Sequence, residues 1–331
     1  MKALIARKQD KGYSVALEDL DELPPGDVTV DIAYSSLNYK DALAVTAKGK
    51  IIRKFPMVIG IDLAGTVIES TTDEFKPGDR VIGTAQGLGE TEWGGYAQRQ
   101  RVLAKTLVHL PPTLSFEEAM QIGTAGFTAM LCVMALDAYG LVPSEREMVV
   151  TGAAGGVGSI AGQIGKILGC RVVGIAGGKE KCRWVVDELG FDDCIDYKAG
   201  NVGGALSEAC PEGIDVYFDN VGGDILDAAL EHMKDFGRIV ACGMISGYCE
   251  AERPPGPRNI FRIVTKRLRM QGFIVIDFLP RFPEAALQLG VWAAEGKIHN
   301  RVHLVEGFLS APTAINMLFT GENTGKLVVK V

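Results

Sequence analysis

Residues 149–183 constrain the fold of this chain more than any other stretch. They read VVTGAAGGVGSIAGQIGKILGCRVVGIAGGKEKCR, in the order strand, glycine-rich turn, helix, second strand and basic loop. The turn carries four glycines, Gly152, Gly155, Gly156 and Gly158. Backbone N–H groups at the start of such a helix can bind a pyrophosphate, and glycines let it approach closely. The stretch therefore predicts a dinucleotide-binding β-α-β unit.

The end of the second strand indicates which dinucleotide binds. An NAD site usually has Asp or Glu there, which binds the ribose 2′-hydroxyl. In this chain the strand 171–175 is followed by Ala-Gly-Gly and then by Lys179, Glu180 and Lys181. Cations without a preceding acid favour a 2′-phosphate, so we expect NADPH as the cofactor. The alternative is that Glu180 binds the ribose hydroxyl, which would favour NAD.

Composition limits the classes of partner. The 331 residues suggest about two domains, and the net charge of −7 argues against nucleic acid or an anionic membrane as the main partner. We find no run of about 18 apolar residues and no secretory signal at the start of the chain. We therefore expect a cytoplasmic protein whose partner is a small-molecule substrate, with no nucleic acid and no membrane.

Cysteine and histidine give no sign of a metal site. The seven cysteines include no CxxC pair, and the four histidines are dispersed. His299 and His303 are four residues apart, but their surroundings read as strand or loop, not helix. We expect reduced thiols and no bound metal.

The chain shows two patterns of predicted secondary structure, one after the other. The first part has short β-rich segments separated by turn residues, which predicts a partly open β-barrel; these segments are 1–7, 28–37, 58–69, 80–83 and 95–102. A capping-box pattern at Ser115 then predicts the start of a helix. After it, strands alternate with helices, which predicts a parallel, doubly wound sheet; the strands are 148–151, 171–175, 193–196, 214–219, 237–242 and 268–275. Residues 303–331 again have a strand-like sequence and are expected to complete the first domain.

This layout resembles the medium-chain dehydrogenase/reductase superfamily. The resemblance implies an α/β fold in which a doubly wound parallel Rossmann sheet, residues 122–300, is joined to a GroES-like β-barrel catalytic domain, residues 1–121 and 301–331. The zinc alcohol dehydrogenases of that superfamily have a His-Glu pair where this chain reads Gly60-Ile61-Asp62. The missing histidine points to the zinc-free branch of quinone, enoyl and enone reductases.

Within that branch the resemblance divides along the chain. Up to about residue 150 the motifs SSLNYKD (35–41) and GLGETEWGGY (87–96) resemble acryloyl-CoA reductases. From about residue 165 the motifs GGKEKCR (177–183), FDNVGG (218–223), PPGP (254–257) and GENTGK (321–326) resemble curcumin, alkenal and prostaglandin reductases. This division suggests a recombinant or designed sequence as a hypothesis.

The resemblance implies reduction of a C=C bond in an α,β-unsaturated carbonyl compound, by hydride transfer from NADPH to the β-carbon and protonation of the resulting enolate at the α-carbon. A tyrosine suits the enolate oxygen that forms, because its hydroxyl is neutral at pH 7 and can donate a hydrogen bond. The catalytic candidates are Tyr39, Asn38, Asp41 and Tyr248. For Asn38 and Asp41, turn capping is an equally good interpretation. Tyr39 could instead simply pack against the barrel.

The same resemblance implies the cofactor-binding residues. Lys181 and Tyr197 are expected at the 2′-phosphate, and Asn220 and Asn323 near the nicotinamide. The complete set is Thr128, Gly152, Gly155, Gly156, Val157, Gly158, Gly178, Lys181, Tyr197, Asn220, Cys242, Gly243 and Asn323.

The substrate is less constrained by the sequence. A basic stretch can bind the phosphates of an acyl-CoA or can be a solvated surface; it comprises Lys40, Lys48, Lys50, Arg53 and Lys54. We favour acryloyl-CoA or a short enoyl-CoA, with an alkenal, enone or quinone as alternatives. A non-catalytic NADPH-binding structural protein is a further alternative. The apolar segment 270–276 is expected at a sheet edge, where it would support a homodimer.

Overall fold

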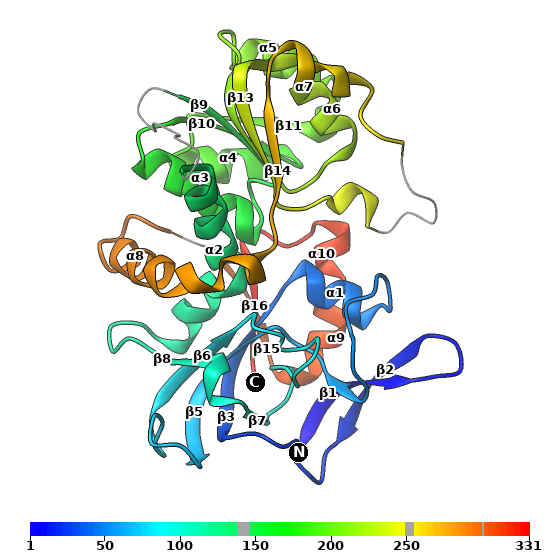
Figure 1. Cartoon of the computed structure of the whole chain (residues 1–331), viewed down its shortest axis with the longest axis vertical. Helices are drawn as coiled ribbons and strands as arrows, with labels where there is room; N and C mark the ends of the chain where they lie inside the picture. Colours follow the sequence, from blue (N-terminus) through cyan, green and yellow to red (C-terminus); the bar gives the residue numbers. More distant parts are fainter. Residues whose placement is uncertain (138–145, 249–254, 300) are drawn as a thin grey trace. The chain divides into compact units, whose positions relative to one another are not determined.

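The computed structural model describes residues 1–137, 146–248, 255–299 and 301–331 (Figure 1). The chain forms two compact units. Unit 1 comprises Met1–Ala125 and Arg301–Val331, and unit 2 comprises Gly126–Asn300. Each unit has its own sheets and its own buried hydrophobic clusters.

Unit 1 is built on antiparallel strands. Its larger sheet has the order β15-β16-β3-β5-β6-β8, and β7 also pairs with β3. These strands are β3 (Val28–Leu37), β5 (Asp62–Ser70), β6 (Arg80–Thr84), β7 (Arg99–Val102), β8 (Leu107–His109), β15 (Val302–Glu306) and β16 (Lys326–Lys330). A second sheet has the order β2-β1-β4, with β1 (Lys2–Lys8), β2 (Tyr13–Asp19) and β4 (Met57–Val58). The last strand, β16, pairs with β3 in the register Leu327↔Leu37, so the C-terminal segment does return to the first domain's sheet.

Two predicted strands of unit 1 are shorter than expected. The prediction of one strand over 58–69 is wrong at its start, because Gly60 has φ 110° and turns the chain between β4 and β5. The strand predicted at 95–102 begins only at Arg99. Before it, Gly95 lies so close to β5 that a Cβ there would be 2.1 Å from the Asp62 carbonyl oxygen. This close approach explains an irregular segment in place of a strand.

Short helices complete unit 1. They are α1 (Tyr39–Val45), η1 (Ala104–Thr106), η6 (Phe308–Ser310), α9 (Ala311–Ala314) and α10 (Met317–Thr320). The long helix α2 (Phe116–Asp137) begins at the predicted capping box, where the Ser115 hydroxyl and the Glu118 carboxylate each accept the other's backbone N–H at 3.1 and 2.7 Å. Gly123, with φ 45°, breaks the helix.

One stretch of α2, Phe116–Leu136, is long and apolar enough to cross a membrane by length and composition. The sequence expectation that the chain lacks such a run is therefore wrong. However, 83% of that window is buried inside the protein, as in the core helix of a globular fold.

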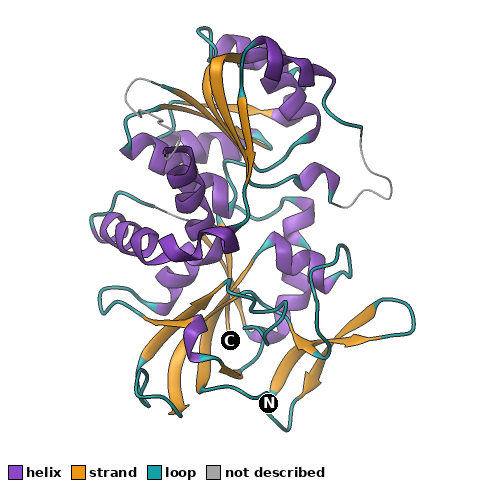
Figure 2. Cartoon of the chain, viewed as in Figure 1, coloured by secondary structure: helices purple, strands orange, loops and turns teal. Residues whose placement is uncertain are grey.

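Unit 2 contains a six-stranded parallel sheet in the order β11-β10-β9-β12-β13-β14. Its strands are β9 (Glu147–Thr151), β10 (Arg171–Ala176), β11 (Asp193–Asp196), β12 (Ile214–Asp219), β13 (Met233–Ala241) and β14 (Arg269–Gly272). Its helices are α3 (Gly156–Ile167), α4 (Lys179–Asp187), η2 (Tyr197–Ala199), α5 (Val202–Ala209), α6 (Gly223–His232), η3 (Ile245–Gly247), η4 (Arg258–Phe261), α7 (Arg262–Thr265), η5 (Val275–Arg281) and α8 (Phe282–Ala294). Figure 2 shows helices on both sides of this sheet, as the doubly wound prediction requires.

The edge strand β14 differs from its prediction. It ends at Gly272, not at residue 275, and after two further residues the chain turns into η5. Its position at the sheet edge is as predicted.

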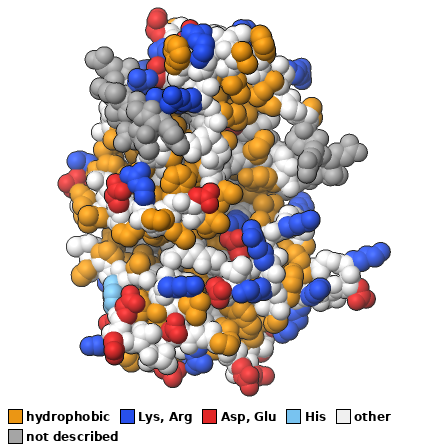
Figure 3. Space-filling model, in the orientation of Figure 1, with side chains coloured by type: hydrophobic (Ala, Val, Ile, Leu, Met, Phe, Trp, Pro, Cys, Tyr) orange, Lys and Arg blue, Asp and Glu red, His pale blue; other side chains and the backbone are white. Residues whose placement is uncertain are grey.

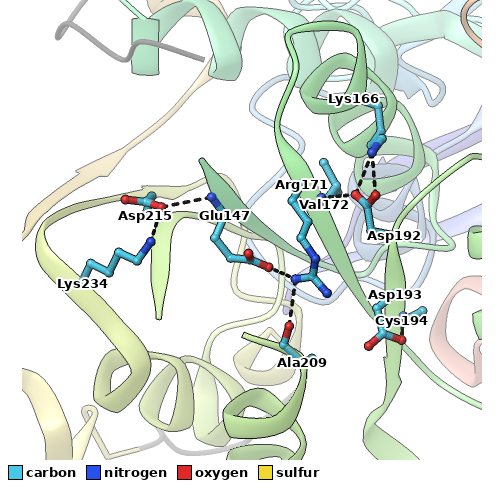
Figure 4. Close-up of polar contacts among 10 residues, drawn as sticks. All are labelled: Glu147, Lys166, Arg171, Val172, Asp192, Asp193, Cys194, Ala209, Asp215 and Lys234. Carbon is cyan, nitrogen blue, oxygen red and sulfur yellow. Dashed lines mark hydrogen bonds and ion pairs between the residues drawn. The ribbon is translucent and has the colours of Figure 1, made fainter. Parts of the chain in front are cut away.

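The amino edge of this sheet is held by charged side chains (Figure 4). Arg171 of β10 pairs with Glu147 of β9 and donates to the Ala209 carbonyl oxygen at 2.8 Å. Lys234 donates at 2.9 Å to Asp215, which also accepts the backbone N–H of Glu147 at 3.0 Å. A further pair joins Lys166 and Asp192 at 2.7 Å, and Asp192 accepts the N–H of Val172. The ion pairs thus tie neighbouring strands together at the end opposite the glycine-rich turn.

Candidate functional site

The glycine-rich turn lies between β9 and α3, as predicted. Gly152 has φ 61°, which favours glycine, and Gly155 is the N-cap of α3. A Cβ on Gly158 would lie 2.3 Å from the carbonyl oxygen of Gly152, so no larger residue fits there. The first N–H groups of a helix have no partner within the helix, so the Gly156–Gly158 backbone can bind an anion. The cradle fits a pyrophosphate.

The basic loop after β10 groups the residues predicted at the 2′-phosphate. Lys181 is half-buried on α4, and burial together with the charge of Lys198 lowers its pKa. Tyr197 packs against Gly177, where a Cβ would be 2.8 Å from the Tyr197 ring. Lys198 was not among the predicted contacts, although it directly follows Tyr197 in the sequence; its charge acts on Lys181, which makes it a further candidate. Two cations and a tyrosine hydroxyl suit a phosphate.

The carboxylate of Asp196, near this basic loop, already has hydrogen-bond partners. Asp196 accepts the backbone N–H groups of Gly178 at 2.7 Å and Lys198 at 3.0 Å. Its role is therefore to connect the end of β11 with the start of α4. Glu180, the alternative ribose ligand, is exposed on α4.

A third group lies at the carboxyl ends of β9 and β12. The Asn220 amide donates to the Thr151 carbonyl oxygen at 2.7 Å, and its backbone N–H donates to the Thr151 hydroxyl at 2.7 Å. Asp219 accepts the Thr151 hydroxyl and the N–H groups of Val221 and Gly222, each at 3.0 Å. Burial raises the pKa of Asp219, and its Oδ2 has no hydrogen-bond partner among the described residues.

Several predicted residues join this group. The backbone N–H groups of Cys242 and Gly243 donate to the Asp219 carbonyl oxygen at 2.8 and 3.0 Å. The Tyr248 hydroxyl accepts the backbone N–H of Met244 at 3.0 Å, and 42% of the side chain is exposed. Unit 2 thus brings Asn220, Cys242, Gly243 and Tyr248 together. Thr128 lies half-buried on α2.

The other catalytic candidates lie at the junction of β3 and α1 in unit 1. Tyr39 is the first residue of α1, and its ring packs edge-on against Phe319, with 5.3 Å between the ring centroids. Asn323, in the loop before β16, is buried and donates to the Gly325 carbonyl oxygen at 3.1 Å.

Asn38 and Asp41 form a capping box at the start of α1. Asp41 is only 1% exposed, and its carboxylate accepts the N–H groups of Asn38 and Ile61, each at 3.0 Å. The capping interpretation of these two residues is therefore correct. The Asp41 carboxylate is thus buried in the interior, and its catalytic role stays a prediction.

The capping box continues into a larger buried group that the sequence did not reveal. Asp62, 0% exposed, accepts the Asn38 amide at 2.9 Å and the backbone N–H of Thr124 at 3.0 Å. It also accepts the hydroxyls of Ser36 and Thr124. The ammonium group of Lys326 donates to the Asn38 side-chain oxygen and, at 3.3 Å, to the Leu37 carbonyl oxygen.

Burial and the neighbouring charges shift the pKa values of the side chains in this buried group. Burial first, and the nearby Asp62 second, raise the pKa of Asp41 to about 7. Burial lowers the pKa of Lys326. The pKa of Tyr96, whose hydroxyl donates to the Ser36 carbonyl oxygen at 3.2 Å, is raised by burial and by the same carboxylates.

The basic stretch of unit 1 is partly neutralised. Lys40 pairs with Glu90, and Lys54 lies 3.6 Å from Glu92. The Lys48 ammonium group lies 5.3 Å from the centroid of the Phe319 ring. On the face shown in Figure 3, basic and acidic side chains are interspersed. The stretch is therefore less cationic than its sequence suggests.

Comparison with known proteins decides the family. Residues 24–112 match the family model described as alcohol dehydrogenase GroES-like domain, and residues 156–292 match that of zinc-binding dehydrogenase. Probable acrylyl-CoA reductase AcuI of Escherichia coli (strain K12) is 38% identical over 333 residues, which cover 100% of this chain and 100% of that protein. The chain belongs to the medium-chain dehydrogenase/reductase superfamily.

Other members of the superfamily resemble it nearly as closely. The NADPH-dependent curcumin reductase of Escherichia coli (strain K12) is 38% identical over 281 residues, covering 82% of this chain and 78% of that protein. The yhdH oxidoreductase of Salmonella enterica, solved in complex with NADP, superposes with a TM-score of 0.82 at 37% identity and 100% coverage of both chains.

The comparisons refine two sequence interpretations. This superfamily member is of the zinc-free type, with Ile61 where zinc relatives have the histidine of the His-Glu pair. Because one relative matches the chain along its whole length, the hypothesis of a recombinant or designed origin finds no support.

Proposed function

We propose that this chain is an NADPH-dependent enzyme that reduces the C=C bond of α,β-unsaturated carbonyl compounds without a metal. The observation that carries the proposal is the fit of unit 2 to NADPH. A glycine cradle at the start of α3 suits the pyrophosphate, and the cations Lys181 and Lys198 suit a 2′-phosphate. Similar proteins support it, since they include an NADPH-dependent curcumin reductase and a 2-alkenal reductase (NADP(+)-dependent).

The chain's own residues then have defined tasks. When bound, NADPH supplies the hydride. The Tyr39 hydroxyl donates a hydrogen bond to the carbonyl oxygen on which negative charge develops, and Tyr248 is the alternative donor. Asn220, Cys242, Gly243 and Asn323 are assigned to the nicotinamide end, and Thr128, Gly178 and Val157 to the remaining cofactor contacts. Residues 122–300 serve as the NADP-binding domain, and 1–121 with 301–331 as the catalytic domain.

For the substrate we favour acryloyl-CoA or a short enoyl-CoA. The full-length relative named as a probable acrylyl-CoA reductase supports this choice. Alkenals, enones and quinones are the alternatives, and the ion pairs of Lys40 and Lys54 count against a strongly cationic site for acyl-CoA phosphates.

A parallel assay tests both levels of the proposal. Oxidation of NADPH and of NADH is followed with acryloyl-CoA, a short alkenal and a benzoquinone. We expect NADPH to be preferred and acryloyl-CoA to give the highest kcat/KM. Turnover of the quinone alone would replace the alkene assignment, and no turnover of any substrate would favour a non-catalytic NADPH-binding protein.

We also propose a homodimer that pairs through the β14 edge. Met270, Ile274 and Ile276 expose apolar side chains at or just after this strand, with 38%, 59% and 49% exposure. Light scattering after size-exclusion chromatography should give twice the chain mass of 35.4 kDa. A monomer at micromolar concentration would contradict this.

A further inference from the structure

A buried centre in unit 1 joins four separate parts of the sequence. We define it as Asn38, Asp41, Asp62, Thr124 and Lys326, which come from the start of α1, the start of β5, the kink of α2 and the start of β16. Asp41, Asp62 and Lys326 are each at most 2% exposed. Charged groups are rarely buried this completely unless they are paired, so the arrangement requires an explanation.

The geometry shows how these charges are held. Asp62 receives donors from three directions, through Asn38, Ser36 and Thr124. The donor from α2 exists only because the helix breaks at Gly123, which turns the Thr124 N–H toward Asp62. A Cβ on Gly123 would lie 2.8 Å from the Asp62 Oδ2, so this contact requires glycine.

Asn38 is the residue through which all the charges meet. Its amide nitrogen donates to Asp62 at 2.9 Å and to Asp41 at 3.1 Å, while its amide oxygen accepts from the ammonium group of Lys326. Together with a 3.2 Å contact from the amide nitrogen to the Ser36 hydroxyl, these hydrogen bonds fix the orientation of the side chain. Asn38 is also the N-cap of α1, so the residue that follows it, Tyr39, inherits its position.

We propose that Lys326 is a positioning residue for Tyr39: its ammonium group balances Asp41 and Asp62 and orients Asn38, which fixes the start of α1. This inference rests on the role given to Tyr39 in the proposed function. Removal of the ammonium group leaves two buried carboxylates around Asn38 without a cation and leaves the Asn38 oxygen without its charged donor.

The charge state of the centre then matters for Tyr39. Asp41 faces Asp62 from β5, Lys326 from β16 and the Tyr96 hydroxyl from the segment before β7. With a pKa of about 7, Asp41 changes its charge within the physiological range. Since a cation lowers the pKa of a neighbouring carboxyl group, loss of Lys326 moves that change to higher pH.

The test uses the full chain with Lys326→Met and a matched control, Lys330→Met. Lys330 lies on the same strand, is half-exposed and pairs with Glu306 at 3.7 Å at the surface. Fluorine NMR of fluorotyrosine-labelled protein, with the Tyr39 signal assigned by Tyr39→Phe, reports the surroundings of Tyr39 independently of activity. Steady-state kinetics with NADPH and acryloyl-CoA is measured over pH 5–9.

For Lys326→Met we expect a shifted or broadened Tyr39 signal and a fall in kcat of about 100-fold, since small displacements of a catalytic group cost that much. The Kd for NADPH should change less than about twofold, because all the assigned cofactor contacts except Asn323 lie in unit 2. The pH midpoint of the Tyr39 signal and of kcat should rise by about one unit or more. Lys330→Met should match the unmodified protein in every measurement.

Three outcomes separate the possibilities. An unchanged Tyr39 signal, or a fall in kcat without movement of either pH midpoint, would overturn the inference and leave Lys326 a purely structural residue. If Lys326→Met does not fold, Lys326→Gln, which keeps a donor for the Asn38 oxygen but carries no charge, replaces it; the same midpoint should rise, and an unmoved midpoint would overturn the inference. An unmodified protein that reduces no substrate would refute the proposed function alone, because the NMR comparison still decides the positioning role.

Discussion

Unit 1 buries two carboxylates together with an ammonium group, whereas the described residues of unit 2 bury one carboxylate, that of Asp219, and surround it with backbone N–H groups. In unit 1 the interactions run through side chains from four parts of the sequence. In unit 2 they run through the local turn 219–222 and one hydroxyl, that of Thr151.

The difference indicates a division of tasks. A centre made of charges responds to pH and to substitution of a distant side chain such as Lys326. A turn made of glycines and backbone groups responds mainly to added volume. Substitutions in the buried centre of unit 1 should therefore alter turnover, and substitutions in the glycine-rich turn of unit 2 should alter cofactor affinity.

The largest effect is expected from Gly158→Ala in unit 2. The new Cβ would lie 2.3 Å from the Gly152 carbonyl oxygen, and backbone cannot move aside as a flexible side chain can. We expect the Kd for NADPH to rise at least about 100-fold, as the pyrophosphate loses its helix N-terminus.

Gly290→Ala in α8 is the matched control for added volume. No atom lies within 4 Å of its Cβ position, so this helix glycine should accept alanine with unchanged NADPH affinity. Isothermal titration calorimetry measures both variants. Equal Kd values for NADPH in the two variants would show that the space around Gly158 does not determine cofactor affinity.

Tyr39→Phe should give the largest effect within unit 1. Loss of one hydroxyl donor at the developing oxyanion predicts a fall in kcat of about 100-fold, with less than about a twofold change in the Kd for NADPH. Tyr248→Phe, measured in the same steady-state assay, identifies the donor: the larger loss of kcat marks it. Unchanged turnover in Tyr39→Phe would show that the Tyr39 hydroxyl takes no part in the mechanism.

Lys181→Ala should have a smaller and more selective effect. Loss of a charged contact to the 2′-phosphate predicts a rise in the KM for NADPH of about tenfold. KM for NADH should stay nearly constant, since NADH lacks that phosphate. Lys179→Ala, an exposed lysine at the start of the same helix, serves as the control. Equal effects on the two cofactors would contradict the phosphate role.

The smallest effect concerns stability and pH. Asp41 has a pKa of about 7 in the folded protein, well above its ordinary value of 3.8, so the folded state holds a proton that the unfolded state releases. Its contribution to stability is complete below the ordinary value and is lost as the pH rises through 7. Between pH 6 and pH 8 the free energy of unfolding should fall by about 1 kcal/mol.

Urea unfolding of the unmodified protein and of Asp41→Asn isolates this contribution. Asparagine cannot ionise, so the difference between the two proteins should change with pH by that amount. The pKa of Asp219 is raised as well and acts in the same direction in both proteins, so it cancels in the comparison. A constant difference from pH 6 to pH 8 would show that Asp41 does not titrate there.

The sequence predicted unit 2 well because its signals are local. The run of β-branched residues, the glycines and the following helix lie next to one another, and the structure places β9, the turn and α3 as expected. The end of β14 was predicted wrongly because it depends on where the chain turns into η5. The apolar segment Met270–Ile276 runs across that point and gives no sign of the turn.

The buried centre of unit 1 could not be predicted in the same way. Asp62 and Lys326 are 264 residues apart in the sequence, and each alone looks like an ordinary charged residue at a strand end. Only the pairing of β16 with β3, at Leu327↔Leu37, brings Lys326 to Asn38. The LNYKD motif indicated that Asn38 and Asp41 matter, but not that their partners lie on β5, α2 and β16.

The ion pairs along the amino edge of the six-stranded sheet connect β9, β10, β12 and β13 without using any residue of the glycine-rich turn or the basic loop. A library of coenzyme-preference variants can therefore randomise residues 179–181 and 197–198, leaving Gly177, Gly178 and Asp196 unchanged, while the strands keep their register. The contacts that hold the strands and the residues proposed to select the coenzyme thus lie at opposite ends of the sheet.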